Sequence, residues 1–150
     1  MRALVQRVSS ASVATDGEEI GRIGPGLLVL LGVTHSDTVQ DAERLAAKVM
    51  ALRVFPDAHG RMNAPLGDRE LLCVSQFTLY AETRRGNRPS YGAAAPAEVA
   101  EPLYERFCEV TGARRGRFGA DMAVALVNDG PVTLMLEHPP AAQDPFRVQL

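Results

Sequence analysis

The segment Leu71–Tyr80, with the sequence LLCVSQFTLY, sets the strongest constraint on how this chain can fold. It begins as an unbroken apolar run, which is typical of a β-strand that is buried on both faces. Ser75, Gln76 and Thr78 then follow without a charged residue or a glycine that would mark an exposed turn. A buried polar group without a partner costs about 1–3 kcal/mol. These groups are therefore either satisfied by neighbouring main chain or face a ligand in a pocket at the end of the strand.

A tight turn beginning near Gln76 would bring the polar side chains to one site. In a regular strand Ser75 and Thr78 point to opposite faces, whereas a turn places them together. Such a turn would also leave the main-chain N–H groups of Phe77 and Thr78 free to bind a ligand oxygen.

The charge distribution allows a nucleic-acid partner without requiring one. The chain has 150 residues and a net charge of -2, which suits one domain and argues against general coating of nucleic acid. All of its basic residues except Lys48 are arginines, whose planar guanidinium groups match phosphate geometry. Two groups of arginines either meet a nucleic-acid end or are solvated loop charges: Arg84, Arg85 and Arg88, and Arg114, Arg115 and Arg117.

The two cysteines and the N-terminus point to a cytoplasmic protein. Cys73 and Cys108 are too few for a disulfide scaffold and too far apart in sequence for a zinc motif, so we expect two small core residues. The N-terminal sequence MRALVQRV lacks the apolar core of a signal peptide. The apolar run 27–31 is too short to span a bilayer, so no membrane association is expected.

Apolar periodicity predicts a layered β-sheet with two covering helices, as strands come first and then alternate with helices. One helix is expected from a cap at Ser36 or Asp37 to about Arg53, and another from Pro96. One domain is expected over residues 1–137, followed by a Pro-rich tail at 138–150. Strands are expected at 2–8, 11–15, 18–23, 27–33, 71–75, 117–128 and 132–137.

Arg7 and Gly130-Pro131 each have two interpretations. Arg7 shares a strand face with Ala3 and Val5, so it either extends to water at a sheet edge or reaches inward to hold a backbone carbonyl. Gly130-Pro131 is either an ordinary trans turn into the last strand or a cis bond, which is found in about 5–6% of X-Pro bonds. A cis bond would turn two carbonyls to the same side.

Known catalytic motifs are absent from the sequence. There is no P-loop, no Rossmann fingerprint, no GxSxG elbow and no cluster at metal-ligand spacing. The three histidines, His35, His59 and His138, fall in expected loops or the tail. We therefore expect no metal and no cofactor, and any chemistry must depend on hydroxyls, backbone or substrate.

Four segments together resemble the D-aminoacyl-tRNA deacylase family. The resemblance runs from Met1 to about Leu136, although the connections before Leu71 and between Phe107 and Phe118 are shorter than is common. The motifs SQFT (75–78) and GPVT (130–133), at this separation in a chain of this length, are together specific for the family. The segments are Gln6–Val8, Ser75–Tyr80, Arg117–Met122 and Asn128–Thr133.

The resemblance implies an α/β fold with a mixed, barrel-like sheet, and a homodimer that hydrolyses D-aminoacyl-tRNA at the 3′-terminal adenosine. Glycyl-tRNA would also be a substrate, because glycine has no side chain. A Gly130-Pro131 motif with a cis bond would enter the active site of the partner subunit and exclude L-residues sterically. Steric exclusion can reject an L-aminoacyl group more strongly than an attractive pocket can, because such a pocket discriminates between two similar substrates by only about 1–3 kcal/mol.

The resemblance also implies roles for individual residues. The ribose 2′-OH of the tRNA would assist attack by water, since no histidine or carboxylate is evidently placed to activate Ser75 or Thr78. Arg7 would hold the Gly-Pro motif, and Thr133 would support it. Pocket and adenine contacts would come from Ser75, Gln76, Phe77 and Thr78, and from Phe118 and Met122.

Two rival functions make different predictions. A non-enzymatic RNA-binding module would bind without ester loss and would depend on the arginine groups alone. A Ser/Thr hydrolase of small esters would be labelled at Ser75 or Thr78 by an active-site phosphonate.

Overall fold

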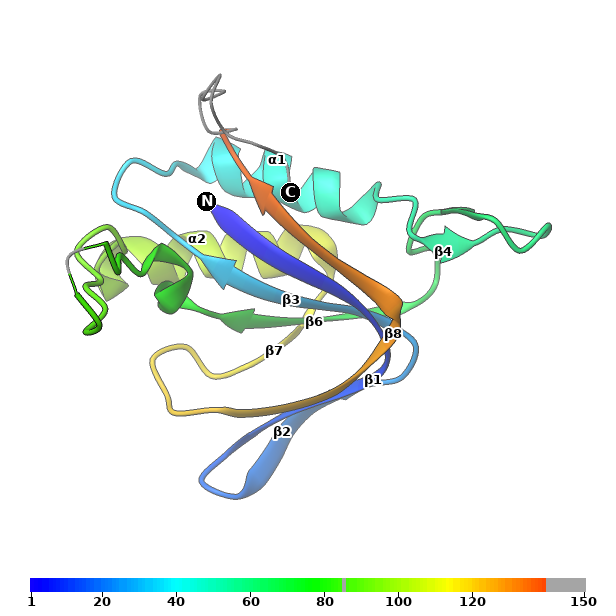
Figure 1. The fold of residues 1–150 in the computed structure, drawn as a ribbon, viewed down its shortest axis with the longest axis horizontal. Helices are drawn as coiled ribbons and strands as arrows, with labels where there is room; N and C mark the ends of the chain where they lie inside the picture. The colour runs from blue at the N-terminus through cyan, green and yellow to red at the C-terminus, as the bar shows by residue number, and fades with distance from the viewer. Residues whose placement is uncertain (85, 140–150) are drawn as a thin grey trace.

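A computed structural model of the chain describes residues 1–84 and 86–139. A mixed sheet with the strand order β2-β1-β3-β6-β7 curls into a barrel-like shape, and β8 pairs with the outer edge of β1 (Figure 1). The expected sheet with two covering helices is confirmed. The strands are β1 (Arg2–Thr15), β2 (Glu18–Ile23), β3 (Gly26–Gly32), β6 (Glu70–Ser75), β7 (Arg114–Arg115) and β8 (Ala123–Glu137), with a separate pair β4 (Phe55–Pro56) and β5 (Met62–Ala64).

The long strand β1 organises the sheet. Its first half pairs with β3 and its second half with β2, while β8 runs along its other edge on both halves. The sequence predicted two shorter strands, but pairing with β8 keeps β1 continuous. The predicted hairpin at Asp16-Gly17 is confirmed, and both residues have positive φ values of 53° and 80°, as a two-residue hairpin turn requires.

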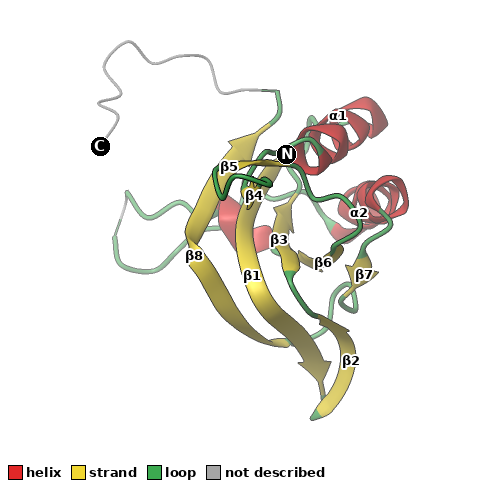
Figure 2. Cartoon of the chain, turned by 90° about the vertical axis from the view of Figure 1, so that its right-hand side faces the viewer, coloured by secondary structure: helices red, strands yellow, loops and turns green. Residues whose placement is uncertain are grey.

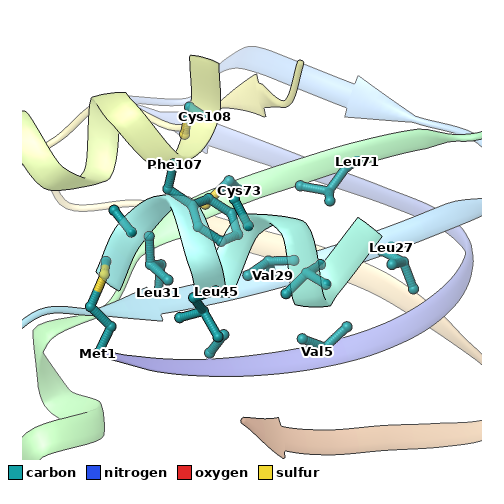
Figure 3. Packing of buried hydrophobic residues seen from close by; sticks show 14 of the residues in the cluster. Met1, Val5, Leu27, Val29, Leu31, Leu45, Leu71, Cys73, Phe107 and Cys108 are labelled. Carbon is teal, nitrogen blue, oxygen red and sulfur yellow. The ribbon is translucent and has the colours of Figure 1, made fainter. Parts of the chain in front are cut away.

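The apolar run 71–74 forms the buried strand that the sequence predicted. Strand β6 pairs in parallel with β3, so that Leu31 lies beside Ser75, and every residue from Leu71 to Val74 is buried. Helices α1 (Val39–Met50) and α2 (Ala97–Thr111) cover one face of the sheet, as Figure 2 shows. Leu45 and Phe107 from these helices pack against β3 and β6 (Figure 3).

Helix α1 begins later than predicted. Its N-cap is Thr38, whose hydroxyl accepts from the Asp41 N–H in a capping box. Asp37 is engaged elsewhere: its carboxylate pairs with the Met1 ammonium at 2.6 Å and accepts the Thr34 N–H at 2.7 Å. The helix also ends at Met50 instead of Arg53.

Strand β8 differs most from expectation. It starts at Ala123 and continues to Glu137, whereas a strand from Arg117, a turn and a second strand were predicted. The expected turn is a bulge within β8: Val8 pairs with Asn128 and Gln6 pairs with Thr133, so that Arg7 alone lies opposite residues 129–132.

The expected tail lies mostly outside the described residues, which include only His138 and Pro139 of it. The His138 N–H donates to the Met1 carbonyl at 2.9 Å. Within the part of the chain that the structure describes, neither helix is long and apolar enough to cross a membrane.

Candidate functional site

A cavity of about 440 Å³ lies where β6 ends and the chain turns into a 3₁₀ helix, η1 (Phe77–Tyr80). The tight turn expected near Gln76 is therefore present. Two walls come from the sheet and from the start of α2, and the third comes from the loop before β8. The lining residues are Leu31, Val33, Val74, Ser75, Gln76, Phe77, Ala95, Ala97, Ala100, Phe118, Gly119, Ala120, Asp121, Met122 and Val124.

The turn is held tightly against β3. The Gln76 N–H donates to the Leu31 carbonyl at 2.8 Å, and Arg2 donates from Nη1 to the Leu79 carbonyl at 2.8 Å. Gly32 makes this approach possible, because a Cβ there would lie 3.1 Å from the Gln76 carbonyl oxygen. Position 32 therefore excludes larger residues unless the floor of the pocket moves.

Some residues of the turn line the pocket, whereas two of its polar side chains form a hydrogen bond with each other. Ser75, Gln76 and Phe77 line the cavity, but Thr78 does not, contrary to expectation. The Thr78 hydroxyl instead accepts a hydrogen bond from the Gln76 side-chain amide. The main-chain N–H groups of Phe77 and Thr78 donate to no described protein group, because they are the first donors of the 3₁₀ helix.

Phe118 and Met122 reach the pocket from a loop instead of a strand face. The predicted alternation is wrong here, since residues 117–122 form turns before β8 begins. The Phe118 ring lies 5.8 Å from the Tyr104 ring, centroid to centroid. Tyr104 in turn donates to the Cys73 carbonyl at 2.9 Å, which ties this wall to β6.

Few ionisable side chains line the described part of the cavity. Asp121, an exposed residue, is the one titratable side chain among the described lining residues. Cys73, two residues before Ser75 in β6, is fully buried, and this burial raises the pKa of its thiol, so it is a poor nucleophile at neutral pH. Residues 1–84 and 86–139 contain no group of three His, Cys, Asp or Glu side chains that could hold a metal ion.

The Gly-Pro motif forms a second centre around Arg7. The Arg7 side chain is only 12% exposed, and its Nε lies 3.1 Å from the Asp129 carbonyl oxygen and 3.0 Å from the Asp129 carboxylate. Its Nη1 also donates to the Val54 carbonyl. The guanidinium therefore lies within the bulge and holds two main-chain carbonyls.

Gly130 is required at its position for two reasons. Its φ is +107°, which side-chain-bearing residues rarely adopt, and a Cβ would collide with the Arg7 guanidinium. The expected cis bond is not present: within the described residues the one cis bond precedes Pro139, so Gly130-Pro131 is trans. Thr133 follows the bulge and accepts from the Gln6 amide at 3.2 Å.

The structure thus gathers the predicted site residues into two groups. Ser75, Gln76, Phe77, Phe118 and Met122 share the pocket. The motif around Arg7 does not belong to that lining, and Gly130 and Pro131 are both exposed.

Several lining positions of the pocket were not predicted from the sequence. Asp121 is one of them, although a carboxylate between two expected pocket residues, Phe118 and Met122, was a usable signal. Ala95, Ala97 and Ala100 carry no chemical signal, since alanine is common in helices.

Comparison with known proteins identifies the family. A family model described as D-Tyr-tRNA(Tyr) deacylase matches residues 4–137. The chain belongs to this family. The predicted membership, and the prediction of a hydrolase, are confirmed.

Proteins named D-aminoacyl-tRNA deacylase are similar over nearly the whole chain. The one from Opitutus terrae is 56% identical over 145 residues, which cover 91% of this chain and 97% of that protein. The one from Marinobacter nauticus is 55% identical, with coverage of 91% and 94%. The one from Myxococcus xanthus is 53% identical over 150 residues, with coverage of 95% and 98%.

Two solved structures share the fold. One, titled c-Myc DNA Unwinding Element Binding Protein, has a TM-score of 0.87 and 43% identity, and the match covers 93% of this chain and 99% of that one. Another, titled as a probable eukaryotic D-amino acid tRNA deacylase, has a TM-score of 0.75 and coverage of 90% and 97%. Its identity of 15% supports similarity of fold alone.

Proposed function

We propose that this chain hydrolyses the ester that joins a D-amino acid to the 3′-terminal adenosine of tRNA, releasing free tRNA and the amino acid. The observation that carries the proposal is the pocket at the end of β6, where Ser75, Gln76 and Phe77 meet Phe118 and Met122. The chain would then serve chiral proofreading in the cytoplasm, where aminoacyl-tRNAs are used for translation.

The reaction adds water to the ester carbonyl carbon and breaks its bond to the ribose 3′ oxygen. Negative charge develops on the former carbonyl oxygen in the transition state. The N–H groups of Phe77 and Thr78 suit this charge, because neither donates to a described protein group. They would form the oxyanion hole.

The proton that water loses must pass to the leaving 3′ oxygen. Among the described lining residues there is no histidine or lysine, and the one carboxylate, Asp121, is exposed. The 2′-OH of the terminal ribose is adjacent to the leaving oxygen and would assist this transfer. Ser75 and Thr78 would then act by positioning, without forming a covalent intermediate.

Phe118 and Met122 would flank the adenine. Both are partly buried in the pocket wall, and aromatic rings and thioethers suit stacking on a flat base. Asp121, between them in the loop, lies at the rim where ribose hydroxyls would pass.

Rejection of L-aminoacyl-tRNA would come from a second copy of the chain. Gly130 and Pro131 are exposed and outside their own pocket, so the partner subunit's bulge would have to supply a wall where an L side chain points. Strand β8 also exposes apolar side chains that would suit a homodimer interface: Leu126, Val127, Leu134 and Met135. Glycyl-tRNA would pass this wall, because glycine has no side chain.

Arg7 and Thr133 would support this wall from behind. Arg7 holds the Asp129 carbonyl and blocks a Cβ at Gly130, which leaves bare main chain facing outward. The trans bond found here means that exclusion would depend on this bare main chain and not on a cis geometry.

The decisive assay follows ester loss from D- and L-tyrosyl-tRNA and from glycyl-tRNA. D-tyrosyl- and glycyl-tRNA should be hydrolysed and L-tyrosyl-tRNA spared. A tRNA ending in 2′-deoxyadenosine should be nearly inert, whereas Thr78→Val should retain measurable activity. Rapid hydrolysis of the deoxy substrate would refute the assisted mechanism, and binding without any ester loss would indicate an RNA-binding module.

Assembly is tested by sedimentation together with chiral selectivity. The wild-type chain should sediment as a dimer, and Val127→Glu, on the exposed face of β8, should weaken the dimer and increase hydrolysis of L-tyrosyl-tRNA relative to D-tyrosyl-tRNA. Ser36→Glu, in the exposed turn before α1, is the control for added charge. A monomeric wild-type chain that still rejects L-tyrosyl-tRNA would contradict the shared site.

A further inference from the structure

Two exposed aromatic side chains pair at the mouth of the pocket. The rings of Phe77 and Tyr91 lie 5.1 Å apart, centroid to centroid, and meet edge to face at 74°. Phe77 is 55% exposed and Tyr91 39%, although Phe77 also lines the pocket. The pair therefore continues the pocket wall outward with flat aromatic surface.

Tyr91 belongs to a segment that is fixed to the sheet. The Ala95 N–H donates to the Val33 carbonyl at 3.0 Å, and the Ala94 N–H to the Tyr91 carbonyl at 2.9 Å. The Thr34 hydroxyl donates to the Ala93 carbonyl at 2.6 Å. The exposed ring is thus presented from anchored main chain, which lowers the entropy lost when a ligand binds.

An arginine-bearing loop leads directly into Tyr91. Glu82 and Ser90 exchange two main-chain hydrogen bonds of 2.8 and 2.9 Å that close this loop, and Arg84 and Arg88 line a hollow of about 500 Å³ within it. The loop sequence carries three arginines and one glutamate. Even with Arg84 paired to Glu82, the loop keeps a positive charge beside the aromatic pair.

Two of the three arginines in the other group pair with carboxylates. Arg114 pairs with Glu70 at 2.8 Å, and Arg115 pairs with Glu105. Arg117 forms no ion pair among the described residues, and it precedes Phe118 of the pocket wall. The loop at 82–90 differs because it leads directly into the exposed aromatic pair, so its arginines lie beside a surface on which a base can stack.

We propose that Tyr91, with Phe77, Arg84 and Arg88, binds the unpaired nucleotides that precede the terminal adenosine of the RNA substrate. A base would stack on the exposed aromatic surface while Arg84 and Arg88 contact phosphates, as in other single-strand binding surfaces. This inference rests on the proposed function, since it extends the strand outward from the pocket that would hold the adenosine. Tyr91 is a substrate-positioning residue in this arrangement.

The test compares a long and a minimal substrate. D-tyrosyl-tRNA includes the preceding nucleotides, whereas 3′-O-D-tyrosyladenosine lacks them. Tyr91→Ala should raise KM for the tRNA by roughly 5- to 150-fold, the range expected for loss of one stacked base, with kcat nearly unchanged. KM for the nucleoside ester should stay within about twofold, and Tyr91→Phe should behave as wild type because the ring is kept.

Salt dependence tests the arginines. Arg88→Ala should reduce the slope of log KM against log salt for the tRNA by about 0.7, the value for one phosphate contact to a single strand. Arg61→Ala, which replaces an exposed arginine in the turn between β4 and β5, is the matched control and should leave the slope unchanged.

The comparison of the two substrates can overturn the proposal. It would do so if Tyr91→Ala raised KM equally for the tRNA and the nucleoside ester, or raised KM for neither.

A binding measurement separates this inference from the proposed function. A short fluorescent oligoribonucleotide that ends in adenosine should bind the wild-type chain, and Tyr91→Ala should weaken its binding. If neither ester is hydrolysed by the wild-type chain but this difference persists, the proposed function fails and the nucleotide surface stands. If the oligoribonucleotide binds both proteins equally, the nucleotide surface is wrong whatever the activity.

Discussion

Substitution of Gly130 by alanine tests how Arg7 holds the bulge in β8. The main chain at φ +107° is expected to cost a side-chain-bearing residue about 1–3 kcal/mol. The new Cβ would also displace the Arg7 guanidinium, which bonds to the Asp129 and Val54 carbonyls. Hydrogen bonds from charged groups contribute about 1.5–3 kcal/mol each. If one of them breaks, the free energy of unfolding should fall by about 2.5–6 kcal/mol.

A double-mutant cycle separates the two contributions. Equilibrium urea unfolding, followed by circular dichroism, is measured for Gly130→Ala, Arg7→Ala and the double variant. In the Arg7→Ala background, Gly130→Ala should cost only the main-chain part, about 1–3 kcal/mol, because the guanidinium is gone. Gly17→Ala is the matched control, since Gly17 has a φ of +80° and no atom within 4 Å of its Cβ position. Additivity of the two substitutions within about 0.5 kcal/mol would refute the collision with Arg7.

Three further predictions concern other groups. Tyr104→Phe should lower the urea unfolding free energy by about 1 kcal/mol, because it removes the buried hydroxyl that donates to the Cys73 carbonyl; no change would mean that the bond contributes nothing. Burial raises the pKa of the Cys73 thiol, so a thiol reagent at pH 8 should label this residue only after unfolding, and labelling of the native chain would contradict that burial. The Arg84 side chain beside Glu82 lowers the pKa of Glu82 to about 2, so its carboxyl NMR signal should titrate near pH 2, and Arg84→Ala should move the midpoint upward. Because the pKa of Glu82 is lowered in the folded chain, the pair with Arg84 stabilises the fold at pH values above 4.5, the ordinary pKa of glutamate. This stabilisation is lost as the pH falls toward 2. A titration midpoint near 4.5 for Glu82 in the wild-type chain would show that the pair does not form in solution.

Local sequence signals predicted the centre of the sheet well. The apolar run 71–74 is typical of a buried strand, and Asp16-Gly17 could adopt the positive φ values of a hairpin turn. The turn after Ser75 followed from the same logic, because polar side chains at the end of a buried strand need partners. A pocket at the end of β6 was one of the two interpretations that these polar groups left open, and a cavity lies there.

Long-range contacts decided what local signals left open. Thr38 and Asp37 are both residue types that favour the N-cap position. Thr38 caps the helix because the Asp37 carboxylate pairs with the Met1 ammonium. Phe118 and Met122 alternate as a strand would, but Gly119 at φ +73° lies in a turn. Pairing on each side of the bulge made β8 one strand, and no sequence pattern near Gly130 announced it.

The bulge opposite Arg7 separates four residues of β8 from the pairing that sets the register of the strand. Slipping a paired strand by one residue reverses which of its side chains face inward, so a one-residue insertion elsewhere in β8 would expose side chains of β8 that now face the interior. Residues 129–132 are outside the pairing, with Asn128 and Thr133 anchored on β1 to either side. Substitutions in this projection that keep Gly130 and the contacts of Arg7 could therefore change its exposed surface without shifting the register of β8.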